Sequence, residues 1–258
     1  MQSLKDFLQH ESVGVETCAH CGNIYKLFNT PHGPMGACKP CEDKKFIKSL
    51  NLPTTTQYRQ QKEQLFIQSF ERASTDLQDV TVNSYKPNHE TQKQAKQMIV
   101  DFITKFDGTQ SIVLAGSPGI GKSHLAYATN KAIRKMGYKT LFIKSTELLD
   151  AIKRTYDYKS NITDEQIFRM IDKLDLLVLD DLGGEYEKKN EGETWASDIL
   201  FKVVDMRLGK SLITTTNYNE SGLIKKYGQV QGSRIVSRVM ENAKSLRMEG
   251  TDQRRERF

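Results

Sequence analysis

The sequence lacks any apolar run long enough to cross a lipid bilayer, because a membrane-spanning helix needs about 20 consecutive apolar residues. The opening residues, MQSLKDFLQHESVG, carry charges and lack the apolar stretch of a secretory signal. We therefore expect a cytoplasmic protein without a membrane partner. Of the 258 residues, 27% are charged and 37% are hydrophobic, which suits a soluble chain of one large domain, or of one ordinary domain and a small one.

Cysteine is absent beyond residue 41, and disulfides are not expected in the cytosol. The 4 cysteines form two C-x2-C pairs, and the intervening gap is typical of a zinc ribbon. Buried structural thiols or a redox pair are the alternatives, and His20 and His32 are possible substitute ligands. Residues 1–50, which hold these cysteines, are too few to build an apolar core on their own. Zinc would therefore supply the folding energy of this segment. The predicted ligands of this structural site are Cys18, Cys21, Cys38 and Cys41.

Glycine and proline are concentrated in GSPGIGKSH, where they would disrupt a helix or a strand. The spacing G-x-x-x-x-G-K-S instead favours a loop whose backbone N–H groups surround phosphates, while Lys122 reaches the β- and γ-phosphates and Ser123 binds Mg²⁺. A strand over 111–116 and a helix over 123–137 supply the context that this motif requires; a loop without a ligand is the alternative. The predicted nucleotide contacts are Gly116, Ser117, Pro118, Gly119, Ile120, Gly121, Lys122, Ser123 and His124.

Two carboxylates follow the apolar strand DLLVLDD, at the end of the strand where ligands bind in open α/β sheets. Asp180 is predicted to hold Mg²⁺, directly or through water, and Asp181 to orient or deprotonate an attacking water. Glu185 is a rival for the second role, since a glutamate reaches farther toward the γ-phosphate. A pair of capping aspartates without catalytic function is the alternative.

Other polar residues are candidates for contact with the γ-phosphate. Asn217 ends the strand SLITTTN, where an amide can point at that phosphate; a turn-forming asparagine is the alternative. Arg234 and Arg238 lie four residues apart on one helix face, and arginine stabilises a transferred phosphoryl group, often across a subunit boundary. Arg254 is a candidate from within the same chain. The alternative for each arginine is that it belongs to a basic, solvent-exposed face and has no role at the nucleotide.

Cations and aromatic side chains are interleaved in TELLDAIKRTYDYKSN. Such a segment suits single-stranded DNA, because cations follow the phosphates while aromatic rings stack on bases. Amphipathic helix edges also carry tyrosine and lysine without any ligand. The modest net charge of +6 argues against tight duplex binding. The predicted DNA contacts are Lys153, Arg154, Tyr156, Tyr158 and Lys159.

Three regions are expected along the chain. Residues 1–50 form the zinc-binding domain, and residues 51–86 form a polar linker with one helix that lies against a domain. From residue 87 onward, helical and strand patterns alternate, which indicates a parallel sheet with helices on both faces. Residues 87–258 are therefore predicted to be the nucleotide-binding domain.

Several segments resemble a known family, namely GSPGIGKSHLA, LLVLDDLG, TTTNYN, RIVSRVME and the terminal GTDQR. They are similar to segments of the bacterial DnaC/DnaI helicase-loader ATPases and the related IstB transposition helpers, over about residues 85–258. An N-terminal zinc module resembles the DnaI type in particular. The resemblance implies a P-loop AAA+ fold, in three layers, that binds ATP or ADP with Mg²⁺.

The resemblance also assigns roles to residues of this chain. Lys122 and Ser123 match the Walker A residues, and Asp180 matches the Walker B aspartate. Asp181 stands where most AAA+ proteins have the catalytic glutamate. Because of this departure, we expect slow, switch-like hydrolysis of ATP. The other matches are sensor 1 at Asn217, the arginine finger at Arg238 with Arg234 nearby, and sensor 2 at Arg254.

The function that the family implies is that of an ATP-dependent helicase loader. The zinc domain would bind the replicative hexameric helicase, while the ATPase domains self-assemble and contact single-stranded DNA during replication initiation. A bacterial host is expected, and the chain is compact enough to be phage-encoded. The alternative is an IstB-like transposition helper that binds duplex DNA and recruits a transposase, but a zinc docking module fits the loader better. A small-molecule P-loop kinase would explain neither the arginines nor the cysteines.

Overall fold

The computed structural model describes residues 12–50, 52–185 and 194–252. The chain divides into two compact units, Met1–Gln61 and Lys62–Phe258. Within the described ranges, no helix is both long enough and apolar enough to cross a membrane. Helix α2 (Thr55–Phe70) begins in the first unit and ends in the second, where Ile67 is buried in the core.

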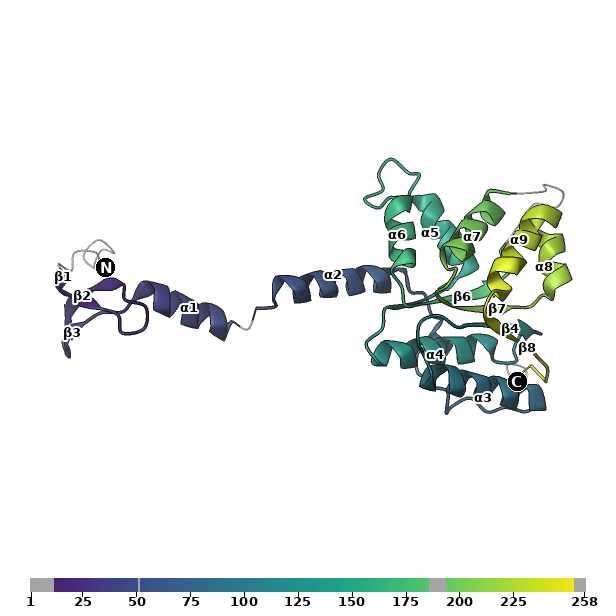
Figure 1. Ribbon diagram of the computed structural model, residues 1–258, viewed down its shortest axis with the longest axis horizontal. Coiled ribbons are helices and arrows are strands. Elements are labelled where there is room, and N and C mark those ends of the chain that lie inside the picture. The colour runs from purple at the N-terminus through teal and green to yellow at the C-terminus, as the bar shows by residue number, and fades with distance from the viewer. Residues whose placement is uncertain (1–11, 51, 186–193, 253–258) are drawn as a thin grey trace, which may run out of the picture. The chain divides into compact units, whose positions relative to one another are not determined.

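The first unit is a small antiparallel sheet followed by a helix (Figure 1). Strands β1 (Ser12–Thr17), β2 (Ile24–Thr30) and β3 (Gly33–Met35) pair in chain order, and α1 (Lys39–Ser49) begins directly after Cys38. Of its residues between 12 and 50, only Cys18 and Cys38 are buried. This part of the unit therefore has almost no apolar core, as expected for a fold held by a metal.

The second unit is built on a parallel sheet of five strands in the order β5-β6-β7-β4-β8. Strand β4 lies between β7 and β8 and precedes the phosphate loop; the predicted acidic pair lies near the carboxyl end of β6, and Asn217 directly follows β7. The alternation of strands and helices along the sequence produces this parallel arrangement. The strands are β4 (Ser111–Gly116), β5 (Thr140–Lys144), β6 (Leu176–Leu182), β7 (Ser211–Thr216) and β8 (Ala243–Met248).

Helices cover both faces of this sheet, so the predicted three-layer architecture is confirmed (Figure 1). One face carries α3 (Glu90–Thr104) and α4 (Lys122–Lys135), and side chains such as Leu114 and Val178 pack beneath them. A separate core, which includes Leu177, lies under the helices of the other face. Those helices are α5 (Ser145–Arg154), α6 (Asp164–Asp172), α7 (Trp195–Met206), α8 (Glu220–Tyr227) and α9 (Gln229–Met240).

Most predicted elements of the second unit are present, including the Thr163–Gln166 capping box that opens α6. Strand β8 and helix α8 were not anticipated. The strand pattern of β8 is weak because AKSLRM lies at the edge of the sheet, where most of its side chains remain in contact with solvent. Pairing with β4, rather than local sequence preference, makes this segment a strand.

Candidate functional site

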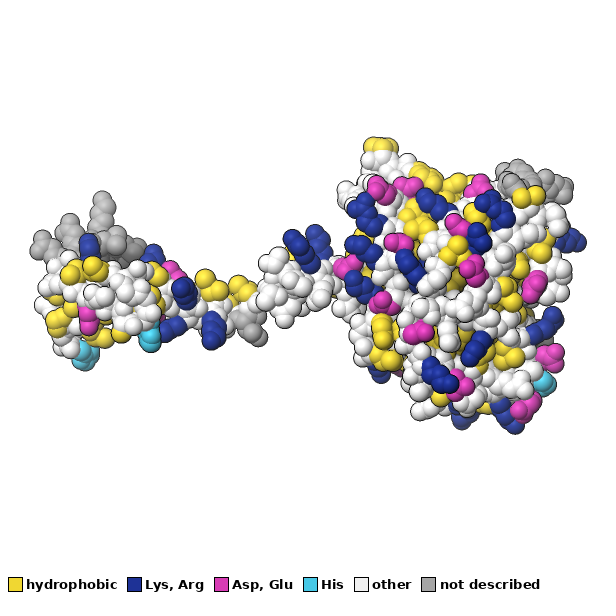
Figure 2. All heavy atoms as spheres, viewed as in Figure 1, with side chains coloured by type: hydrophobic (Ala, Val, Ile, Leu, Met, Phe, Trp, Pro, Cys, Tyr) yellow, Lys and Arg dark blue, Asp and Glu magenta, His cyan; other side chains and the backbone are white. Residues whose placement is uncertain are grey.

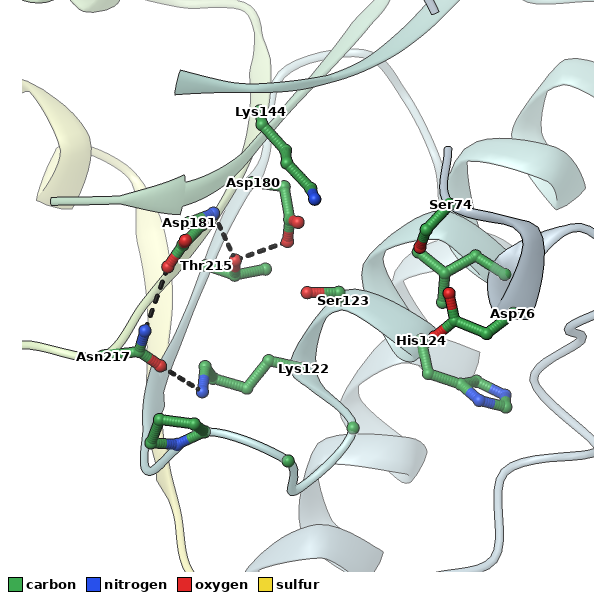
Figure 3. A pocket seen from close by; sticks show the side chains of 14 residues that line it. Ser74, Asp76, Lys122, Ser123, His124, Lys144, Asp180, Asp181, Thr215 and Asn217 are labelled. Carbon is green, nitrogen blue, oxygen red and sulfur yellow. Dashed lines mark hydrogen bonds between the residues drawn. The ribbon is translucent and has the colours of Figure 1, made fainter. Parts of the chain in front are cut away.

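A polar cavity of about 530 Å³ opens at the carboxyl ends of the central strands (Figure 3). Its walls come from the phosphate loop, from the ends of β5, β6 and β7, and from the segment that precedes α3. This is the position where open α/β sheets bind ligands. The lining residues are Ser74, Asp76, Leu77, Pro118, Gly119, Gly121, Lys122, Ser123, His124, Lys144, Asp180, Asp181, Thr215 and Asn217.

The glycine-rich loop passes from β4 into the first turn of α4, and its conformation depends on Gly121. That residue has φ = +89°, and a Cβ atom there would lie 2.3 Å from the ring of Tyr85. The Tyr85 hydroxyl in turn donates to the carbonyl of Ile120 at 2.7 Å. This packing holds the amino end of α4 at the cavity, so its free N–H groups and helix dipole are available to an anion.

Lys122 is buried at the base of the phosphate loop. Its ammonium donates to the carbonyl oxygens of Gly116 and Ser117 at 2.8 and 2.7 Å, and to Asn217 Oδ1 at 2.9 Å. Asn217 Nδ2 donates to Asp181 Oδ1 at 3.0 Å, so one amide joins the lysine to the acidic pair. The structure therefore brings together three of the residues that the sequence assigns to phosphate chemistry (Figure 3).

The acidic pair shares one face of the sheet because β6 is bulged. Successive residues of a regular strand point to opposite faces, yet both Asp180 and Asp181 line the cavity. The pairing of β6 with β7 is interrupted after Leu179, and Asp181 adopts φ = +55°. The Thr215 hydroxyl accepts from the Asp181 amide at 2.9 Å and donates to Asp180 Oδ1 at 2.6 Å. Thr215 thus stabilises the bulge and orients both carboxylates.

The residues around Asp180 fit a hard divalent cation. Burial raises the pKa of the Asp180 carboxyl group, while hydrogen bonds from Thr215 and Ser123 and the positive charge of Lys144 oppose the rise. A carboxylate and a neighbouring serine hydroxyl are oxygen donors of the kind that Mg²⁺ prefers. Mg²⁺ commonly keeps water and phosphate oxygens as its remaining ligands.

Glu185, the rival of Asp181, is engaged elsewhere. Its carboxylate accepts hydrogen bonds from the Ser145 hydroxyl, at 2.8 Å, and from the Tyr227 hydroxyl. Glu185 is buried and is not among the residues that line the cavity. Its contacts connect the turn after β6 to α5 and α8, so Asp181 is the better candidate for orienting water.

The wall opposite the acidic pair was missed by the sequence analysis. It is formed by Ser74, Asp76 and Leu77, of which Thr75–Leu77 make a short 3-10 helix. His124 closes this side of the cavity; its ring contacts Tyr85 and its Nε2 lies 3.1 Å from the Thr81 carbonyl oxygen. The segment belongs to the predicted linker, which has no motif, so only its packing against α4 reveals it.

Arg234 and Arg238, the two predicted arginines that the structure describes, do not line the cavity. On α9, the Arg238 Nε lies 2.7 Å from Asp205 of α7, and the Arg234 guanidinium lies over the Phe201 ring at 3.8 Å. Both side chains remain partly open to solvent. This position leaves them available to a neighbouring molecule but not to the cavity of their own chain. Arg254 lies outside the described residues.

The predicted DNA contacts lie in the last turn of α5, at Lys153 and Arg154, and in the loop that follows it, and the structure adds Trp195 to them. Tyr158 is 89% exposed, with the Lys159 ammonium 5.4 Å from its ring centre. The rings of Tyr156 and Trp195 stand edge to face with centroids 6.1 Å apart, and the indole N–H donates to the Tyr156 hydroxyl at 3.3 Å. Because Trp195 begins α7, 39 positions along the chain from Tyr156, no local pattern could have identified it.

The four cysteines converge as the spacing predicts. Their sulfur atoms all lie within 4.8 Å of one another, with 3.7 Å between Cys18 and Cys41 and 3.4 Å between Cys21 and Cys38. Sulfur atoms at about 2.3 Å from a tetrahedral zinc ion would be similarly spaced. Hydrogen bonds from the backbone N–H groups of His20 and Cys21 lower the pKa of the Cys18 thiol to about 6, which favours a thiolate. Neither predicted substitute, His20 nor His32, belongs to this cluster.

The family model of the IstB-like ATP-binding proteins matches residues 52–257. The chain belongs to this family. The replicative helicase loader DnaC of Escherichia coli K12 is 30% identical to this chain over 165 residues, which are 63% of each chain. This chain thus spans less than two thirds of the length of that relative.

Two solved structures are similar to the second unit of this chain. A crystal structure of the DnaC helicase loader is 25% identical, with a TM-score of 0.56, over 68% of this chain and all of that one. A crystal structure of DnaI has a TM-score of 0.58 at 20% identity, over 70% of this chain and 94% of its own, and supports the fold alone. The second unit of this IstB-like protein has the AAA+ fold that the sequence predicts.

Proposed function

We propose that this protein is an ATP-dependent loader of the replicative DNA helicase. The observation that carries the proposal is the cavity in which Lys122, Ser123, Asp180 and Asn217 meet at the amino end of α4. Kinship with the DnaC-type loaders and the cysteine cluster of the first unit support it.

Five residues of the cavity have proposed parts in ATP hydrolysis. The loop amides and Lys122 would bind and orient the phosphates, and Ser123 and Asp180 would hold a magnesium ion. When bound, that ion neutralises charge on the β- and γ-phosphates. Asp181 accepts a hydrogen bond from, and orients, the attacking water, while Asn217 fixes the Asp181 carboxylate. Because an aspartate reaches less far than a glutamate, slow turnover is expected.

Arg238 is expected to act on the cavity of a neighbouring copy. Arg238→Ala should leave ATP affinity unchanged and lower kcat of the assembled protein by about a thousandfold, the low end of an arginine finger's contribution. Nucleotide titration and steady-state hydrolysis at high protein concentration measure the two quantities. Arg169→Ala, which removes another helical arginine from a surface ion pair, is the control. Equal loss of ATP binding and hydrolysis would show that Arg238 stabilises the fold and does not act on a neighbouring copy.

The first unit is the proposed docking domain for the hexameric helicase. Its sheet exposes a set of large apolar side chains, visible as yellow surface in Figure 2, that a soluble unit would otherwise bury. This apolar set consists of Val13, Val15, Ile24, Phe28 and Met35. Contact with a partner would remove it from water.

Co-purification of the full chain with the host's replicative helicase tests the loader proposal. The wild-type protein should form a complex whose native mass changes with ATP, and Ile24→Asp should abolish the complex without loss of zinc. Asn29→Asp adds the same charge to an exposed polar position of β2 and should have no effect. Absence of a complex with the wild-type, zinc-loaded protein would disprove the loader function.

Single-stranded DNA is proposed to bind at the aromatic residues beyond α5. Trp195 is the single tryptophan of the chain, so its fluorescence reports directly on this surface. An oligothymidine should quench this fluorescence, and Tyr158→Ala should weaken binding by about tenfold, because one stacked base contributes about 1–3 kcal/mol. Tyr138→Ala, at a distant exposed tyrosine, is the control. If the oligothymidine binds without quenching the Trp195 fluorescence, the DNA contacts another surface of the protein.

The family name favours a second candidate, an IstB-like transposition helper that recruits a transposase. Such a protein would bind duplex DNA at least as tightly as a single strand. Repeating the fluorescence titration with a duplex of equal length separates the candidates, since a loader should prefer the single strand.

A further inference from the structure

Lys144 is a cation of the cavity that the motifs of the family do not account for. It is the last residue of β5, and its register partner on the neighbouring parallel strand β6 is Asp180. Adjacent strands lie about 4.8 Å apart, and paired residues share a face of the sheet. Lys144 is half-buried and lines the cavity beside Asp180 and Ser123 (Figure 3).

The two cavity lysines are held differently. Lys122 donates to three oxygen atoms of the loop and of Asn217. For Lys144, no hydrogen bond to a described residue and no carboxylate oxygen within 4.0 Å is found, although its charge opposes the rise that burial causes in the pKa of Asp180. Its ammonium therefore lies near the buried carboxylate without being fixed to it.

We propose that Lys144 is a resident cation that substitutes for the divalent metal ion beside Asp180. A buried carboxylate next to bound phosphates is costly unless a positive charge compensates it. The Lys144 ammonium supplies that charge to a nucleotide bound without metal, and it moves aside when Mg²⁺ takes the position between Ser123 and Asp180. This inference rests on the proposed nucleotide function of the cavity.

The consequence is that Lys144 makes nucleotide binding less dependent on magnesium. Removing its charge should weaken metal-free binding, because Asp180 then repels the phosphates. The same removal should preserve or strengthen binding with Mg²⁺, because the metal no longer competes with an ammonium. Charges at neighbouring positions of a partly buried site interact strongly enough for an effect of about tenfold.

The test compares binding of a fluorescent ATP analogue to the full-length protein in excess EDTA and in excess Mg²⁺. For Lys144→Met, the ratio of the two Kd values, EDTA over Mg²⁺, should rise about tenfold above the wild-type ratio. Lys144→Arg keeps the charge and should keep the wild-type ratio. Lys105→Met, at an exposed lysine after α3, is the matched control, and Lys144→Gln replaces the methionine variant if that variant does not fold.

Each outcome decides the question. An unchanged ratio in Lys144→Met would show that the ammonium is a solvated bystander and would overturn the proposal. Equal weakening with and without metal would make Lys144 a general phosphate ligand and would overturn it as well. If the wild-type protein binds no nucleotide under either condition, the nucleotide function itself fails. Only a rise in the ratio of the two Kd values that is confined to the uncharged Lys144 variants supports the proposal that this lysine substitutes for the metal ion.

Discussion

Lys122→Ala should abolish measurable ATP binding, with a loss in affinity of at least about a hundredfold. The lysine is the cation closest to the phosphate loop, and charge-assisted hydrogen bonds of this kind contribute about 1.5–3 kcal/mol each. Two such bonds to phosphate oxygens account for the expected loss. Calorimetric titration of the full-length protein with ATP and Mg²⁺ measures it.

The control for this variant must separate lost binding from lost folding. Lys122 donates to two loop carbonyls and to Asn217, so its removal also releases these groups. Lys135→Ala removes an exposed lysine from the last turn of the same helix and should bind ATP normally. If Lys122→Ala melts like this control yet still binds ATP as the wild type does, the assignment of the loop is wrong.

Removal of zinc should unfold the first unit while the second unit continues to bind ATP. The first unit has almost no buried apolar residues among those described, whereas the second has two extensive cores. Structural zinc supplies about 10–16 kcal/mol to small domains of this kind, which exceeds what their packing provides. Cys38→Ser should have the same effect as a chelator, because it removes one of the converging thiols.

Metal analysis and hydrogen exchange measure this prediction. The purified protein should contain one zinc per chain, and chelation should deprotect amides of β1 and β2 without changing those of β4 or β6. His20→Asn is the matched control, since His20 lies between two of the thiols but outside the cluster. A zinc content far below one equivalent would disprove the zinc-ribbon assignment. Loss of zinc in the His20→Asn variant would show that His20 is a ligand.

The acidic pair, Asp180 and Asp181, shows which part of the site can be predicted from the sequence and which part cannot. DLLVLDD predicts a buried strand ending in two carboxylates, and both line the cavity as expected. An ideal strand would have pointed one of them away. The bulge at Asp181 brings both carboxylates to the cavity. It depends on hydrogen bonds between the Asp181 backbone and side chains of β7 and α5, which lie far away in the sequence.

The same limit applies to the residues that the sequence analysis missed. Leu77 reaches the cavity only because its segment packs against α4, and Trp195 reaches Tyr156 only because α7 begins beside the end of α5. Lys144 meets Asp180 through the register of two parallel strands. None of these pairs has a fixed spacing along the chain, so no motif describes them.

By itself, the sequence determined the parts of this protein whose chemistry is local. A phosphate loop needs glycines at set intervals before a helix, and a zinc knuckle needs two cysteines at one short spacing, so both can be recognised in a linear pattern. Only the tertiary structure decided which distant side chains complete these sites. Strand register, a bulge and helix packing bring them together, and these arise from contacts between segments far apart in the chain.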